Sequence, residues 1–229
     1  QAAYNKTMAQ DHQLGALFVF SRSEGADENF WASRTKYRIY SIQQLFAGPD
    51  KDKDNSGSAS ETGKVGSVFR LTYNYKEKYM LEANGRLDGS EKFPKSKRYG
   101  FFPSIAVGYN ISNEKFWDNI RPVISNLKLR LSWGQTGNAD ISTNAFASYQ
   151  AANGWVGADH NPVTAVTKAK LENPDLKWET TTEWNFGLDF GFLKDRITGS
   201  VDVYQRVISD LLNYKPLNSY QEVKQIMAN

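Results

Sequence analysis

Glu179 and Glu183 are the first residues whose types and spacing suggest chemistry, because two carboxyl groups can act as general acid and base. In an extended strand, residues four apart share one face and are separated by about 13 Å, at roughly 3.3 Å per residue. A glycosidase needs its two carboxyl groups about 5–9.5 Å apart. Asp189 and Asp202, on two strands of a predicted hairpin, can come closer, but a polar sheet surface explains them equally well. The spacing therefore disfavours acid–base catalysis.

Other catalytic and metal motifs are missing or incomplete. The chain contains no cysteine, which excludes disulfides, thiolate metal sites and cysteine nucleophiles. The two histidines, His12 and His160, are predicted to lie in a tight turn and a long loop, so neither a triad nor a zinc site is expected. Residues 57–64 resemble a phosphate-binding loop only superficially, because one residue too many separates the glycines and Val65 replaces the required Ser or Thr. We predict that the chain is not an enzyme and uses no cofactor.

One acidic segment has the spacing of a calcium-binding loop. Oxygen-bearing side chains occupy positions 1, 3, 5, 7, 9 and 12 of that pattern, namely Asp50, Asp52, Asp54, Ser56, Ser58 and Glu61. Against calcium, Asn55 replaces the turn glycine, and Lys51 and Lys53 reduce the local negative charge. No flanking helices are evident. The favoured interpretation is a polar surface loop without metal, with calcium as the alternative.

Five residues are better suited to binding a ligand than to catalysis. Trp31, Tyr149 and Trp155 fall in predicted long loops, where flat aromatic faces can stack on sugars, pack against a peptide or wedge loop against loop. Arg86 and Asp88 lie near the end of a predicted strand, where they either line a passage or remain solvated. These five residues are the candidates for substrate binding.

Strands must position these residues, because alternation with a period of two is the dominant pattern. Between residues 177 and 192 the even positions are apolar or threonine, whereas the odd positions are polar or glycine. Helix is confined to short turns within 40–46 and 113–120. The sequence predicts eight strands: a weaker hairpin over about 2–21, then 65–75, 79–88, 101–112, 127–134, 177–192 and 197–206.

The connections between these strands alternate in length. Tight turns are predicted around residues 11, 77 and 195, and long connections at about 24–62, 89–98 and 138–175. Short turns at one end and long loops at the other are typical of an outer-membrane barrel with extracellular loops. Tyr73, Tyr75 and Tyr79 beside one tight turn fit an aromatic girdle at a membrane interface.

Charge separates the two faces of the predicted strands. The apolar faces carry no Asp, Glu, Lys or Arg, whereas the opposite faces carry many of them. A charge that faces lipid at mid-depth costs ~2–4 kcal/mol, so this segregation favours a membrane barrel. Two alternatives remain: a soluble carbohydrate-binding β-sandwich, whose strands also alternate, and a small closed outer-membrane barrel with an adhesive role.

Composition narrows the class further. With 40% hydrophobic and 23% charged residues among 229, the chain has the composition of a globular protein. Its 28 basic and 25 acidic side chains are interspersed, so no nucleic-acid partner is indicated. The longest apolar run, Leu14–Phe20, is far below the ~18 residues of a membrane-spanning helix. Without an initiator Met or export signal, the chain is interpreted as an internal piece of a longer protein.

Several segments resemble the barrel of SusC/RagA-type TonB-dependent outer-membrane transporters. They are YMLEANGRLDGSEKFPKSKRYGFFPSIAVGYNIS (Tyr79–Ser112), LKLRLSWGQTGN (Leu127–Asn138), NPDLKWETTTEWNFGLDFGFLKDRITGSVDVY (Asn173–Tyr204), and the shorter Glu28–Arg34 and Gln44–Gly48. The resemblance implies an all-β, antiparallel transmembrane β-barrel segment. Residues 1–229 would supply about eight strands of a 22-stranded barrel, without its plug domain or closing strands.

The resemblance also implies a function. Such transporters import oligosaccharides or peptides across the outer membrane of Gram-negative Bacteroidota. They pair with a SusD-like surface lipoprotein that acts as a lid, and TonB delivers the energy that displaces the plug. The expectation is that this chain supplies barrel wall and outer loops, in contact with lipid.

Overall fold

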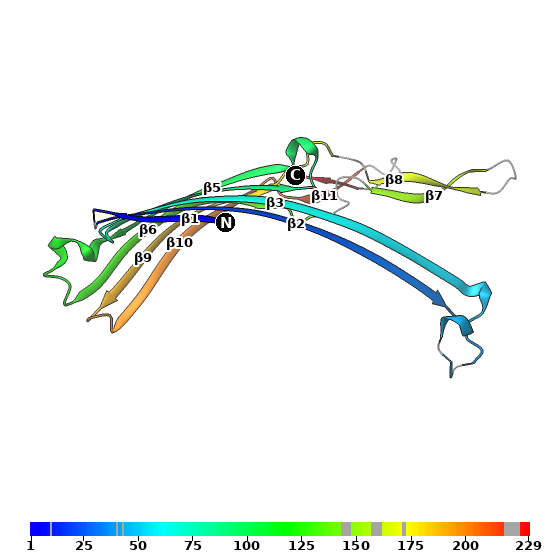
Figure 1. Ribbon diagram of the computed structural model, residues 1–229, viewed down its shortest axis with the longest axis horizontal. Helices are drawn as coiled ribbons and strands as arrows, with labels where there is room; N and C mark the ends of the chain where they lie inside the picture. Colours follow the sequence, from blue (N-terminus) through cyan, green and yellow to red (C-terminus); the bar gives the residue numbers. More distant parts are fainter. Residues whose placement is uncertain are drawn as a thin grey trace. The chain divides into compact units, whose positions relative to one another are not determined.

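The computed structural model describes residues 1–9, 11–39, 41–42, 44–142, 148–156, 162–170, 173–217 and 225–229. For Asp52, 148–156 and 162–170 the description covers the backbone and not the side chains. Eight strands form one antiparallel sheet in the order β1-β2-β3-β4-β5-β6-β9-β10 (Figure 1). They are β1 (Ala2–Met8), β2 (His12–Arg34), β3 (Lys53–Tyr75), β4 (Tyr79–Ser90), β5 (Tyr99–Asn110), β6 (Ile124–Asn138), β9 (Glu179–Phe192) and β10 (Ile197–Ser209).

The eight predicted strands are thus confirmed as the members of this sheet. Its order starts at β1 and ends at β10, so among the described residues the sheet does not close into a small barrel. Two separate hairpins add four short strands, β7 (Ser148–Val156), β8 (Pro162–Lys170), β11 (Asn213–Pro216) and β12 (Gln225–Ala228).

Helical structure in the described residues consists of single 3₁₀ turns. These are η1 (Leu45–Ala47), η2 (Asp50–Asp52), η3 (Lys95–Lys97), η4 (Ile111–Asn113) and η5 (Lys115–Trp117). The turns predicted within 40–46 and 113–120 correspond to η1 and to η4 with η5, apart from Tyr40 and Gln43, which lie outside the described residues. No helix in the described part of the chain combines the length and the hydropathy needed to span a membrane.

The chain divides into two compact units, one of residues 1–22 with 64–229 and the other of Ser23–Gly63. In the second unit, much of the segment predicted as a long connection over about 24–62 is strand, because β2 continues to Arg34 and β3 begins at Lys53. The alternation of apolar residues misses these strands because residues 53–62 are polar or small on both faces. Backbone hydrogen bonds with a neighbouring strand stabilise such a segment without an apolar face.

The strand register in the first unit brings apolar side chains of neighbouring strands into common rows. Residues that pair across a sheet point to the same face, so all members of one cross-strand row share a face, and the rows alternate between the two faces along the strands. One row crosses six strands through Tyr73, Leu81, Val107, Leu131, Phe186 and Val203. The next row, on the opposite face, contains Asn74, Met80, Gly108, Arg130, Gly187 and Asp202. The alternation read from the sequence is therefore consistent across the sheet.

The apolar face of this sheet is not covered. Trp184 and Phe186 are 52% and 48% exposed, and Val107 and Leu131 are similarly open. A soluble sandwich packs such a face against a second sheet about 10 Å away. The described strands form one eight-stranded sheet and two short hairpins, an arrangement that differs from the two packed sheets of the sandwich alternative.

Apart from Phe102 of β5, the buried apolar side chains of the described residues form one cluster beyond the strand ends. Phe93, Ile141, Leu176 and Met227 pack together, with Leu176 completely buried. Hydrogen bonds surround this loop-base cluster. The Glu179 carboxylate accepts from the Asn138 side chain at 3.1 Å and from the Leu212 backbone N–H at 3.0 Å.

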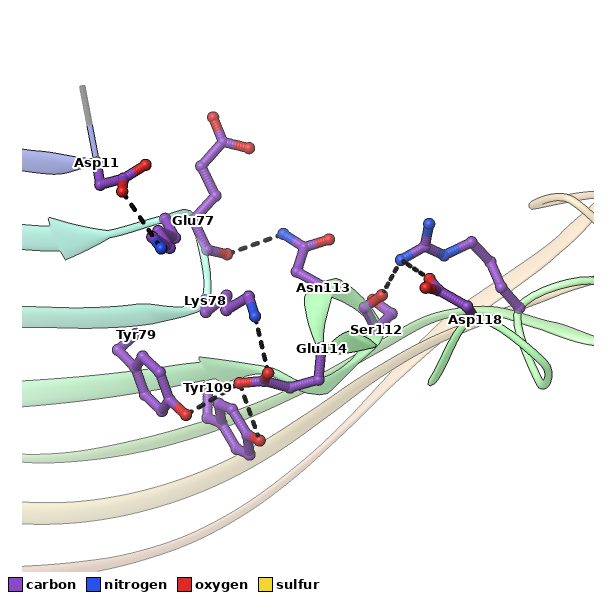
Figure 2. Close-up of polar contacts among 11 residues, drawn as sticks. Asp11, Glu77, Lys78, Tyr79, Tyr109, Ser112, Asn113, Glu114 and Asp118 are labelled. Atoms are coloured by element: carbon purple, nitrogen blue, oxygen red, sulfur yellow. Dashed lines mark hydrogen bonds and ion pairs between the residues drawn. The ribbon is translucent and has the colours of Figure 1, made fainter. Parts of the chain in front are cut away.

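At the opposite strand ends, polar contacts tie successive turns together (Figure 2). Lys76 in the β3–β4 turn forms an ion pair with Asp11 in the β1–β2 turn, at 3.3 Å. The Asn113 side chain donates to the Glu77 backbone carbonyl at 3.0 Å. Glu114 accepts hydrogen bonds from Lys78 at 2.8 Å and from the Tyr79 hydroxyl at 2.9 Å. The short connections therefore form one bonded rim rather than independent turns.

Glu114 makes this rim sensitive to acid. Its hydrogen bond from the Lys78 ammonium, with a further one from the Tyr79 hydroxyl, holds the pKa of the Glu114 carboxyl below its ordinary value. A group whose folded-state pKa is lowered stabilises the fold above its unfolded pKa and stops doing so as pH falls through the folded value. We expect Glu114→Gln to lower the thermal unfolding midpoint at neutral pH. The difference from wild type should shrink below pH ~4.

The control for this measurement is Glu77→Gln, because Glu77 contributes its backbone carbonyl to the rim. Its unfolding midpoint is expected to follow wild type across the same pH range. A difference between Glu114→Gln and wild type that stayed constant from neutral to acidic pH would contradict a role for the Glu114 charge.

Candidate functional site

The polar face of the sheet is centred on Arg130 of β6. Its guanidinium makes two hydrogen bonds to the Asp189 carboxylate of β9, each 2.8 Å long. The same guanidinium lies 3.1 Å from the Asp202 carboxylate of β10. One arginine thus joins three neighbouring strands, because two of its guanidinium nitrogens contact each carboxylate.

The sequence forms this cluster through register and a glycine. Gly187 lies between Arg130 and Asp202 in the same cross-strand row. A Cβ atom at Gly187 would lie 2.6 Å from Arg130 Cζ and 2.7 Å from an Asp202 oxygen. Because glycine has no side chain, the guanidinium can lie flat across the middle strand and reach both carboxylates.

Further charge pairs extend across the same face. Arg206 donates to Glu183 at 2.8 Å, and Arg70 donates to Asn84 at 2.8 Å and lies 3.5 Å from Glu82. The side chains of these ion pairs are about one-third to one-half exposed, so each pair contributes about 0–1 kcal/mol at most. Their main effect is to make this face hydrophilic and hydrogen-bonding.

Two open hollows lie along this polar face. The first has a volume of about 660 Å³, with polar lining from Asn5, Gln13, Asn74, Glu82, Lys128 and Arg130. The second, about 650 Å³, has polar lining from Glu82, Asn84, Ser104, Gln135, Glu183 and Arg206. Side chains of both charges and many amides and hydroxyls line both hollows, and Glu82 lines both. These side chains can form hydrogen bonds with a polar solute at successive positions along the face.

The predicted binding residues are distributed unevenly. Arg86 and Asp88 of β4 are brought together in a short hydrogen-bonded ion pair. Trp31 belongs to the other compact unit, where it is 45% exposed. Tyr149 and Trp155 lie on β7, and their side chains are outside the described residues. Among the side chains that the structure describes in the first unit, Arg86 and Asp88 are therefore brought into contact.

The candidate chemical groups are engaged in structural contacts. Glu179 takes part in the loop-base hydrogen bonds, and Glu183 pairs with Arg206. His12 was predicted to lie in the tight turn but is the first residue of β2, where its Nδ1 lies 2.7 Å from the Tyr73 hydroxyl. His160 lies outside the described residues. Asp189 and Asp202 do approach one another, through Arg130. Sequence reasoning placed Arg130 on the polar face but missed this junction, which the Asp202–Gly187–Arg130 register would have revealed.

The segment with calcium-loop spacing does not form a loop. From Lys53 onward it is part of β3, and Asp50 pairs with Lys53 at 2.8 Å and with Arg34 at 3.4 Å. Alternate side chains of a strand spread along it rather than converging on one point. Among the described residues no group of three or more acidic, histidine or cysteine side chains is arranged to hold a metal. The prediction of a polar surface loop is also wrong over residues 53–60, which are strand.

Comparison with known proteins gives consistent matches. Residues 3–226 match the family described as "TonB dependent receptor-like, beta-barrel". The chain is 38% identical over 174 residues to the TonB-dependent receptor SusC of Bacteroides thetaiotaomicron, covering 71% of this chain and 16% of that protein. It is 33% identical over 227 residues to the TonB-dependent receptor P39 of Formosa agariphila, covering 99% of this chain and 21% of that protein.

Solved structures show the same fold. The RagAB peptide importer in its "closed-closed" state matches with a TM-score of 0.88 at 24% sequence identity, over 99% of this chain and 25% of the matched chain. The "open-open" state of RagAB matches with a TM-score of 0.87 at 23% identity. The chain spans only about a fifth of the length of its curated relatives.

Proposed function

Because the chain belongs to the TonB-dependent receptor-like β-barrel family, we propose that it forms part of the wall of an outer-membrane barrel that imports nutrients into a Gram-negative bacterium. The observation that carries this proposal is the two-sided sheet. Its apolar face is open, and its opposite face carries the Arg130 cluster and both hollows. In a large barrel the first face contacts lipid and the second lines the interior.

The eight-stranded sheet is the middle of a larger barrel in this proposal. Unpaired backbone groups at β1 and β10 cannot face hydrocarbon, because lipid offers them no hydrogen bonds. Neighbouring strands of the complete receptor would pair with both edges, and a plug would fill the lumen of a 22-stranded barrel. The family is one of receptors, in agreement with the prediction of a chain that is not an enzyme.

Partners and energy source follow from the same family. We propose that a SusD-like lipoprotein covers the long connections on the extracellular side and that TonB supplies energy through the plug. Those connections include residues 91–98 between β4 and β5 and 139–178 between β6 and β9. The resemblance of the sequence to SusC/RagA-type transporters supports this partner, and the solved RagAB peptide importer shares the fold of the chain.

The cargo is an oligosaccharide or a peptide. The polar side chains of the hollows suit either, since both classes offer many hydrogen-bond donors and acceptors. Arg86 and Asp88 on the wall and Trp31, Tyr149 and Trp155 in the connections are the residues proposed to contact it.

Uptake by the complete receptor tests this proposal. Cells that carry it should accumulate labelled oligosaccharides or labelled peptides, and uptake should be lost when TonB is deleted. Arg86→Ala and Trp31→Ala should reduce uptake, whereas Arg196→Ala in the opposite β9–β10 turn should not. Failure to take up either class, with the receptor present at the cell surface, would contradict the proposed function.

A further inference from the structure

The connection between β5 and β6, residues 111–123, differs from the other turns at its end of the sheet. The β3–β4 turn and the β9–β10 turn are short, whereas this connection contains two 3₁₀ turns. Arg121 donates to the Ser112 carbonyl at 2.6 Å, and the Trp117 indole N–H donates to the Ile124 carbonyl at 3.0 Å. The connection is therefore a folded element with internal bonds.

Glu114 ties this element to the apolar side of the sheet. It accepts hydrogen bonds from the hydroxyls of Tyr79 and Tyr109, which stack with ring centroids 5.0 Å apart and planes 6° apart (Figure 2). Both tyrosines alternate onto the same face as Leu81 and Val107, their neighbours two residues along. The carboxylate thus lies at the margin of the open apolar face.

Apolar side chains remain exposed on this element despite its internal bonds. Phe116 and Val123 are 63% and 60% exposed, and Ile120 is 40% exposed. The Leu193 backbone N–H donates to the Val123 carbonyl at 2.9 Å, which places the exposed Leu193 beside Val123. We call Phe116, Ile120, Val123 and Leu193 the turn-side apolar patch. Ile197, exposed at the start of β10, shares a face with Val201 and Val203 and leads from the patch to the apolar face.

We propose that the turn-side apolar patch inserts into the lipid surface, at the boundary between headgroups and acyl chains of the leaflet at the short-turn end. The inference rests on the proposed function, because it takes the apolar sheet face to be the lipid-contacting face. The turn-side apolar patch is continuous with the apolar sheet face, and this continuity identifies lipid as the occupant. The tyrosine hydroxyls, Glu114 and Lys78 mark the polar margin. Tyrosine favours a membrane interface because its ring is apolar and its hydroxyl forms hydrogen bonds with water.

The geometry gives the element a defined place in the membrane. Glu114 and Lys78 stay among the headgroups, where an ion pair remains hydrated. Phe116 and Val123 reach toward the acyl chains, as the apolar side chains of other interfacial elements do. The β5–β6 connection would then anchor the wall at a fixed depth, in addition to the tyrosines of the strands.

Spin labelling of the complete receptor tests this placement, because the chain itself has no cysteine to interfere. Single variants Phe116→Cys, Val107→Cys and Glu77→Cys are labelled with a nitroxide in a receptor without other reactive cysteines. The labelled receptors are reconstituted in phosphatidylethanolamine–phosphatidylglycerol vesicles. Oxygen and a water-soluble nickel complex then report exposure to acyl chains and to water. We expect the Phe116 label to lose nickel accessibility relative to Glu77 while it keeps oxygen accessibility, at a depth shallower than Val107.

The other outcomes distinguish failure of the lipid anchor from failure of the proposed orientation of the sheet. A Phe116 label as open to nickel as the Glu77 label would overturn the lipid anchor while leaving the barrel intact. Protection of the Phe116 label from both reagents would mean that protein, such as a plug, covers the patch, and would also overturn it. A Val107 label open to nickel would instead overturn the proposed orientation of the sheet and this inference with it.

Discussion

Replacing Phe186 with lysine is expected to destabilise the complete receptor in lipid by about 2–4 kcal/mol, the cost of a lysine facing the bilayer at mid-depth. Phe186 lies near the middle of β9 and is 48% exposed on the apolar face. Its row neighbours, Leu131 and Val203, are apolar and offer the ammonium no partner. The midpoint of denaturant unfolding in vesicles should shift toward lower denaturant without a change of slope.

The matched control is Asn185→Lys, one residue earlier on the same strand. Asn185 lines the first hollow on the polar face, together with Glu82 and Arg130. A lysine there meets polar groups and water, so its unfolding midpoint should remain within about 0.5 kcal/mol of wild type. If the two lysines cost the same, the Phe186 face is not in contact with hydrocarbon, and the assignment of the faces is wrong.

This assignment was available from the sequence because it depends on a local rule. Alternation along β9, with Trp184, Phe186 and Leu188 on one side, determines which side chains share a face once the segment is a strand. The same rule located all eight strands of the sheet. The rule also predicted that the opposite face is polar, because the charged residues of these strands alternate onto that face.

The rule fails where a strand has no apolar side. Residues 53–62 are polar or small throughout, and only their pairing with a neighbouring strand reveals them as β3. Pairing between distant segments is not encoded in a local pattern. For the same reason the spacing of Asp50, Asp54 and Glu61 suggested a loop site that the extended backbone does not form.

In the candidate site, too, the local pattern predicts which face a residue occupies but not which residues it contacts. The sequence placed Arg130, Asp189 and Asp202 on polar faces, but their junction depends on the register of three strands and on the missing side chain of Gly187. The Glu114 contacts with Lys78 and Tyr79 join residues of separate turns and depend on how the β5–β6 connection folds. Such contacts follow from tertiary geometry, which a pattern of residue types does not specify.

The loop-base cluster leads to the second large expected effect. Leu176 is completely buried among Phe93 of the β4–β5 connection, Ile141 of the β6–β9 connection and Met227 of β12. Replacing a buried leucine with alanine costs about 2–5 kcal/mol, through lost apolar contact and the cavity left behind. We expect Leu176→Ala to lower the stability of this cluster by that amount.

The loss should be local to the connections. Lys92 donates to the Ile141 carbonyl and Asn173 donates to the Met227 carbonyl, so the cluster holds the connections to one another. Hydrogen exchange measured by mass spectrometry should therefore accelerate together in residues 91–98, 139–142 and 225–229. Strands β4, β5 and β6 should keep their protection, since their ladder hydrogen bonds do not pass through Leu176.

Leu211→Ala provides the matched control, because Leu211 lies beside the Leu212 that packs on the cluster but is itself 56% exposed. Truncating this exposed side chain leaves no buried cavity, so hydrogen exchange in all three segments should remain unchanged. If Leu176→Ala accelerates exchange only near residue 176, the three segments do not share one core. Joint acceleration would show that the three segments open together and depend on one buried core.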